Sequence, residues 1–148
     1  MIRWALVAVV VALALAAGAG AATPTHAQFV RQLDAVCQAG NRGPTLTSIN
    51  QLLRARRYRQ AAALVEAVYN RPAQLRALDR IVAPAADAAK FARYKLLTHR
   101  IVGLGLRGAD ALRGGDVELF NRLARQLNTL VRQRTLVAID LGTRHCGQ

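Results

Sequence analysis

Apolar residues recur at intervals of three and four along most of the chain after residue 23, and this spacing constrains the fold more than any other feature. Such positions share one face of an α-helix, whereas a strand needs strict alternation. The clearest stretch precedes Gly142 and has apolar residues at Phe120, Leu123, Leu127, Leu130, Val137 and Leu141, with Ala124, Val131 and Ala138 alongside. Arg134 interrupts this stripe and must either reach water or find a partner. No segment has the alternation or the β-branched density of strands. We therefore expect an all-α fold.

Glycine and proline divide this pattern into four to five helices. The expected helices cover residues 23–38, 45–56, 58–71 with a continuation to 82, 84–113 and 116–141. Pro72 should end or kink the third helix, because proline cannot donate the helical hydrogen bond. Gly115 and Asp116 should stop one helix and cap the next. Short connections between amphipathic helices favour an antiparallel bundle.

The first 22 residues have the layout of a secretory signal peptide. Arg3 precedes an apolar run from Trp4 to Ala17, and a small-residue region at 18–22 offers an A-x-A cleavage site. The alternative is a retained membrane anchor, which needs about 20 strongly apolar residues. We expect residues 1–22 to be a signal peptide and residues 23–148 to form a single helical-bundle domain. The domain would be secreted or associated with the cell envelope, and membrane-anchored if the signal is not cleaved.

Cys37 and Cys146 are the two cysteines of the chain. An exported protein enters an oxidising compartment, where an even cysteine count favours pairing. The alternative is a metal site that includes His145, but zinc requires three or four ligands and no other histidine has a suitable spacing. We therefore expect one disulfide that ties the first helix to the C-terminal tail, with no metal and no cofactor.

The formal net charge is +13, and Lys90 and Lys95 are the only lysines among 21 basic residues. A basic surface attracts anionic partners such as an envelope polymer or a membrane surface. The alternative is that arginine serves solubility, with its abundance set by a GC-rich genome. An exported protein is not expected to meet nucleic acid.

The densest basic cluster consists of Arg54, Arg56, Arg57 and Arg59, which we call the basic turn. Guanidinium groups can bind phosphate or carboxylate through paired hydrogen bonds. The alternative is a solvated turn between two helices, and this alternative is favoured. The basic turn is nevertheless the best surface candidate for binding.

Motifs that could carry catalysis are weak. Residues 103–108 match G-x-G-x-x-G, but a dinucleotide site needs a preceding strand, and these glycines lie within a helical pattern. Close helix packing explains them better. His99 lies in the middle of a predicted helix and is expected to be a buried or half-buried polar residue. We identify no catalytic residue, and the sequence leans away from an enzyme without excluding one.

The placement of Cys37, the Gly115-Asp116 turn and the tail at 141–146 resembles small exported helical proteins of high-GC bacteria. The resemblance covers the chain from about residue 28. It implies an envelope location and a disulfide-tied bundle, and it carries no activity over to this chain.

These observations favour a non-catalytic envelope domain that binds a protein partner or an anionic surface. The first alternative is a carrier of a small apolar ligand within the bundle, suggested by the apolar face from Phe91 to Leu112 with its glycines. The second alternative is a hydrolase. The sequence does not indicate an oligomeric state.

Overall fold

Six α-helices contain most of the residues that the computed structural model describes, which are 23–40 and 46–147. The helices are α1 (His26–Gly40), α2 (Leu46–Arg54), α3 (Tyr58–Tyr69), α4 (Pro72–Asp79), α5 (Ala88–Arg113) and α6 (Val117–Asp140). The predicted all-helical bundle with one disulfide is confirmed. The helix count rises to six because the third predicted segment divides before Pro72 into α3 and α4. The predicted signal peptide lies outside the described residues.

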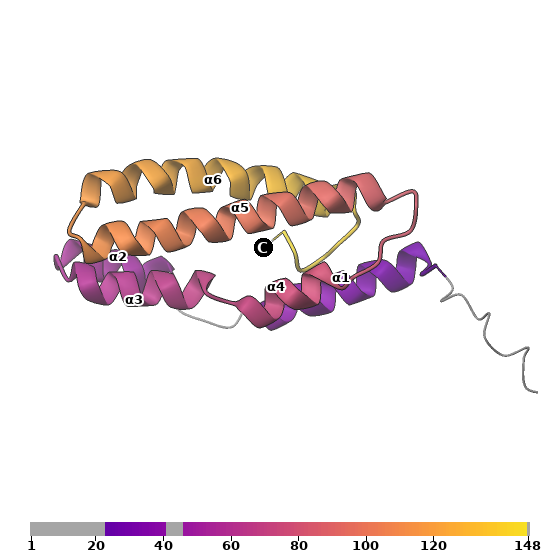
Figure 1. Ribbon diagram of the computed structural model, residues 1–148, viewed down its shortest axis with the longest axis horizontal. Helices are drawn as coiled ribbons and strands as arrows, with labels where there is room; N and C mark the ends of the chain where they lie inside the picture. The colour runs from indigo at the N-terminus through magenta and orange to yellow at the C-terminus, as the bar shows by residue number, and fades with distance from the viewer. Residues whose placement is uncertain (1–22, 41–45, 148) are drawn as a thin grey trace, which may run out of the picture.

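The helices follow an up-and-down path in which two of the legs each contain two helices (Figure 1). Helices α1 and α2 run along the molecule in one direction, and α3 and α4 return beside them. Helices α5 and α6 then form a long antiparallel hairpin that lies over this layer. Helix α5 packs against α6, α3 and α4, whereas α2 packs on α3 and α1 packs on α4. The two layers are therefore joined mainly through α5.

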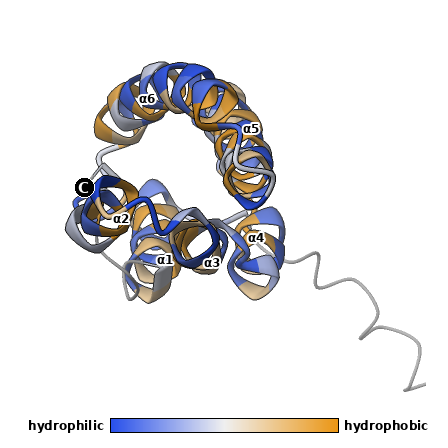
Figure 2. Ribbon diagram, turned by 90° about the vertical axis from the view of Figure 1, so that its left-hand side faces the viewer, coloured by the Kyte–Doolittle hydropathy of each residue, from blue (hydrophilic) through white to orange (hydrophobic). Residues whose placement is uncertain are grey.

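The buried side chains form two clusters, one toward each end of α5. The first surrounds the disulfide and includes Phe29 and Phe91, whose rings meet edge to face with centroids 5.1 Å apart. The second lies between α2, α3 and the C-terminal half of α5, and includes Ile49 and Leu112. Apolar residues gather on the facing sides of the two layers (Figure 2). Amphipathic periodicity accounts for this arrangement, because each helix buries its apolar stripe against the other layer.

Three helix ends share one hydrogen-bond pattern, in which the chain turns through a residue with positive φ. At the end of α5 this residue is Gly115, with φ 76°, and after α6 it is Gly142, with φ 77°. Glycine suits this conformation because it has no Cβ. At the end of α2 the same position is held by Arg56, with φ 56°. The predicted stop and cap at Gly115-Asp116 are confirmed, since the Asp116 carboxylate accepts a hydrogen bond from the Leu119 backbone N–H at 2.8 Å.

Three predicted boundaries are wrong, and the first is the start of α5, which is Ala88 and not Pro84. Helix α1 begins at His26 and not at Thr23, because Thr25 and Gln28 form a capping box in which each side chain accepts a hydrogen bond from the other residue's backbone N–H. Helix α4 ends at Asp79, so the expected helical continuation to Val82 is absent, and Val82 is exposed.

Candidate ligand-binding groove

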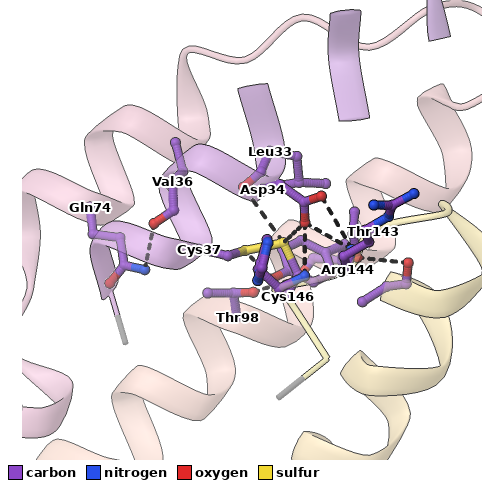
Figure 3. Close-up of a disulfide and its surroundings, with 12 residues drawn as sticks. Leu33, Asp34, Val36, Cys37, Gln74, Thr98, Thr143, Arg144 and Cys146 are labelled. Carbon is purple, nitrogen blue, oxygen red and sulfur yellow. Dashed lines mark hydrogen bonds between the residues drawn. A yellow bond between two sulfur atoms is a disulfide. The ribbon is translucent and has the colours of Figure 1, made fainter. Parts of the chain in front are cut away.

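The C-terminal tail crosses from the end of α6 to α1, where a dense set of polar contacts holds it (Figure 3). Cys146 forms the predicted disulfide with Cys37, across a sequence separation of 109 residues. The Asp34 carboxylate accepts hydrogen bonds from the backbone N–H groups of Arg144 and His145, each at 3.0 Å. We call Asp34, the disulfide and residues 143–146 the tail clamp. It connects the α6 end of one layer to α1 in the other.

Helix α6 is close to α5 but to no other helix in the described parts of the chain. Its apolar stripe is the most regular in the sequence. Leu123 and Val137 are indeed buried, but Leu127, Leu130 and Val131, which lie between them, are only half-buried. Leu130 packs against the cluster around the disulfide, whereas Leu127 and Val131 face a space that no described helix fills.

That space consists of two adjoining cavities, which we call the groove. The first has a volume of about 410 Å³ and is lined by residues of all six helices and the tail. The second has a volume of about 330 Å³ and lies between α2, α3, α5 and α6. Both are lined by Leu46, Tyr69, Leu127 and Asn128, so they meet at these residues. The groove thus extends from the tail clamp toward Phe120, near the beginning of α6.

Arg134 of α6 lines the first cavity and is the arginine that interrupts the apolar stripe. Its side chain is half-buried, and its buried Nε atom has no hydrogen-bond partner among the residues that the structure describes. Arg71 and His145 line the same cavity, and no aspartate or glutamate lines either cavity. A buried donor without a partner is costly, because it has lost its water without a replacement. The groove therefore has positive charge and an unused donor.

Two tyrosines in the groove respond to this environment. Burial raises the pKa of Tyr69 and of Tyr94 above 10.0, and the nearby positive charge of Arg134 partly opposes the rise. The Tyr94 hydroxyl also lies 3.4 Å from Cys37 Sγ. Both hydroxyls are therefore neutral donors at ordinary pH, beside the guanidinium of Arg134.

The G-x-G-x-x-G motif lies entirely within α5, and the structure supports close packing as its role. A Cβ atom at Gly105 would clash with the ring of Tyr69, and one at Gly108 would lie 3.4 Å from the ring of Phe120. Nothing lies within 4 Å of a Cβ atom placed at Gly103. Because no strand precedes these glycines among the described residues, the geometry is not that of a dinucleotide site.

The structure places the basic turn between α2 and α3, away from the groove, and none of its residues lines either cavity. Arg54, Arg56, Arg57 and Arg59 are all exposed. None of these four side chains takes part in an ion pair within residues 23–40 and 46–147. All four guanidinium groups are thus accessible to an external anion.

The expectation that His99 is buried or half-buried is wrong. Its side chain is 45% exposed, and its Nε2 atom lies 3.1 Å from an Asp79 carboxylate oxygen. A second pair, between His26 Nδ1 and Asp87 Oδ2, was not predicted; these atoms are 2.7 Å apart and join the start of α1 to the start of α5. The two pairs span 20 and 61 residues of sequence, and helical spacing reveals neither of them. In the described residues no group of three or more histidine, cysteine or carboxylate side chains is placed to hold a metal.

No protein-family model, curated protein or solved structure matches this chain. Within the described ranges, no helix is both long and apolar enough to cross a membrane. The disulfide is consistent with an extracytoplasmic location.

Proposed function

We propose that this protein is an exported carrier of a small apolar ligand, held in the groove between α6 and the layer formed by α1–α4. The observation that carries the proposal is the half-buried middle of the α6 stripe, where Leu127 and Val131 face a cavity of about 410 Å³. Ligand sites commonly have volumes of about 300–1,000 Å³ and mostly apolar linings. A ligand there would remove the apolar stripe from water, which favours binding.

Export is supported by two independent features. Residues 1–22 have the order of charge, apolar run and small residues that marks a signal peptide. A disulfide between Cys37 and Cys146 requires an oxidising compartment to persist. The resemblance to small exported helical proteins of high-GC bacteria agrees with the same location.

Native mass spectrometry tests this proposal directly. The chain would be expressed with residues 1–22 in place and purified under gentle conditions. We expect a species heavier than the oxidised polypeptide that loses the extra mass on mild activation. A bare polypeptide that also fails to bind any apolar probe would contradict a carrier function.

A variant that fills the groove provides a second test. Ala124 is half-buried and lines the second cavity, so Ala124→Phe would place a ring in the space proposed for the ligand. We expect the variant to fold and to lose binding of an apolar fluorescent probe. Gln126→Phe adds the same ring at an exposed position of α6 and should leave probe binding unchanged. Equal binding by both variants would place the ligand elsewhere.

A second candidate function is binding of an anionic surface through the basic turn, whose four arginines are exposed and outside any ion pair of the described residues. Each basic residue near an anionic membrane contributes about 1 kcal/mol. Sedimentation with vesicles of anionic lipid, at low and high salt, measures this. Replacing the four arginines with glutamine should abolish a salt-sensitive association, and unchanged sedimentation would exclude this role.

A further inference from the structure

The charged side chains of the groove lie at one of its two ends. At the tail clamp, the cavity wall includes Tyr94, Thr98 and Arg134. At the far end, no charged side chain of the described residues lines the wall, which combines apolar side chains such as Ile49, Leu104 and Phe120 with asparagines. A ligand that matches this arrangement has a charged head at the tail clamp and an uncharged tail along the rest of the groove.

The residues at the tail-clamp end of the groove also indicate which charge the head group of the ligand carries. Arg134 and Arg71 line the first cavity, and among the described residues no carboxylate lines either cavity. The Asp34 carboxylate of the tail clamp lines neither cavity, and its hydrogen bonds go to two backbone N–H groups and not to an arginine of the groove. The complementary head is therefore an anion.

The geometry of a guanidinium group restricts this anion further. Nε and a neighbouring Nη present two parallel N–H groups that match the two oxygens of a carboxylate. The Nε of Arg134 is the donor that lacks a partner. Its surroundings include the disulfide and the buried Tyr94, which favours a small head over a large hydrated one.

We propose that the ligand of the groove is a long-chain carboxylate, whose head binds the Arg134 guanidinium and whose chain lies along Leu127 toward Phe120. The inference rests on the proposed carrier function and specifies its ligand class. The Tyr69 hydroxyl, at the junction of the two cavities, lies along the path of the chain.

The test compares palmitate with the neutral alcohol of the same chain length, using delipidated protein and displacement of an apolar fluorescent probe. Because a hydrogen bond to a charged group contributes more binding free energy than one to a neutral group, we expect palmitate to bind about 10- to 100-fold more tightly than the alcohol. Arg134→Met keeps an unbranched side chain and removes the charge, so the affinity for palmitate should fall to that for the alcohol. Arg132→Met removes an exposed charge from the same helix and should change neither affinity.

The possible outcomes separate this inference from the carrier function. If the alcohol and palmitate bind equally well and Arg134→Met changes neither, the groove binds apolar ligands but the carboxylate inference is overturned. If neither compound displaces the probe, the carrier proposal fails as well. If a lysophospholipid binds more tightly than palmitate in an Arg134-dependent way, the head is a phosphate and the carboxylate assignment is wrong. Arg134→Lys, which keeps the charge but not the fork, should retain only part of the preference for palmitate.

Discussion

The tail clamp and the groove lie next to each other, yet they differ in whether their polar groups have hydrogen-bond partners. In the clamp, the Asp34 carboxylate accepts hydrogen bonds from the backbone N–H groups of Arg144 and His145, and the two cysteines are joined. In the groove, the Arg134 Nε is buried without a partner. The chain is therefore able to satisfy buried polar groups in this part of the fold. The exception is Arg134, for which the proposed ligand would supply the missing hydrogen-bond acceptor.

The apolar side chains are also more deeply buried around the clamp than along the groove. Around the clamp, Phe29, Leu33 and Leu141 are fully buried, whereas the α6 side chains over the groove are only half-buried. Helix α6 contacts the other layer through the tail and through Leu130, Val137 and Ala138, which belong to the packing around the disulfide. The clamp thus links the end of α6 to α1 beside the groove, and the two regions can be tested separately.

Removing the disulfide should have the largest effect. In the double variant Cys37→Ala, Cys146→Ala, the unfolded chain regains the freedom of a loop whose ends are 109 residues apart. On the chain-entropy model, the free energy of unfolding should fall by about 4 to 5 kcal/mol. Urea denaturation of the oxidised protein and of the variant measures the difference. A loss below about 1 kcal/mol would show that Asp34 alone holds the tail.

Replacing Asp34 tests the polar half of the clamp while the disulfide remains. Asp34→Ala leaves two backbone N–H groups without their acceptor, and hydrogen bonds to a charged group predict a loss of about 2 kcal/mol in stability. Glu118→Ala removes a carboxylate that is 87% exposed and paired with Arg122, so it should change stability by less than about 0.5 kcal/mol. Equal effects in the two variants would contradict the special role of Asp34.

Alanine variants of Gly105 and Gly103 measure how closely side chains pack at the junction of the two cavities. Gly105→Ala would push against the Tyr69 ring and should cost about 1 to 2 kcal/mol. Gly103→Ala meets nothing within 4 Å and should instead stabilise α5 by about 1 kcal/mol through helix propensity. Thermal unfolding measures both. A neutral Gly105→Ala variant would mean that Tyr69 moves into the groove without cost.

Arg134→Met should change the stability of the ligand-free protein in the opposite direction from the clamp variants. It removes a buried donor without a partner, so the free energy of unfolding should rise by about 1 kcal/mol, reduced from the full penalty because the side chain is half-buried. Urea denaturation after delipidation measures this. A clear loss of stability would show that Arg134 has a structural role within the protein.

The sequence predicted the clamp better than it predicted the groove. Two cysteines allow one intramolecular pairing, so the link between Cys37 and Cys146 followed from composition and compartment. Asp34 as the acceptor for the tail could not be predicted, because its partners lie 110 residues away. The apolar period placed the helices correctly but does not state which helix covers which stripe. The half-burial of Leu127 therefore required the structure.

Arg134 shows how much a sequence can indicate about a site. Its position within the apolar stripe of α6 predicts that it must reach water or a partner. The structure shows a half-buried side chain whose Nε has neither. Periodicity thus identified the anomalous residue, and only the three-dimensional arrangement gave it a chemical environment.

The smallest expected change in stability concerns two helix ends, one at the tail clamp and one at the basic turn. After α6, where the chain turns into the clamp, the residue with positive φ is Gly142, but after α2 the same position in the basic turn is Arg56. Arg56→Gly should relieve backbone strain and raise stability by about 0.5 to 1 kcal/mol, measured by thermal unfolding. Arg59→Gln removes a charge from the basic turn without changing this backbone position, and should leave stability unchanged. If Arg56→Gly also weakens binding to anionic vesicles as much as Arg59→Gln does, a less stable turn is retained there for its charge. If neither variant affects vesicle binding, the basic turn is a solvated connection, and the groove is left as the candidate site.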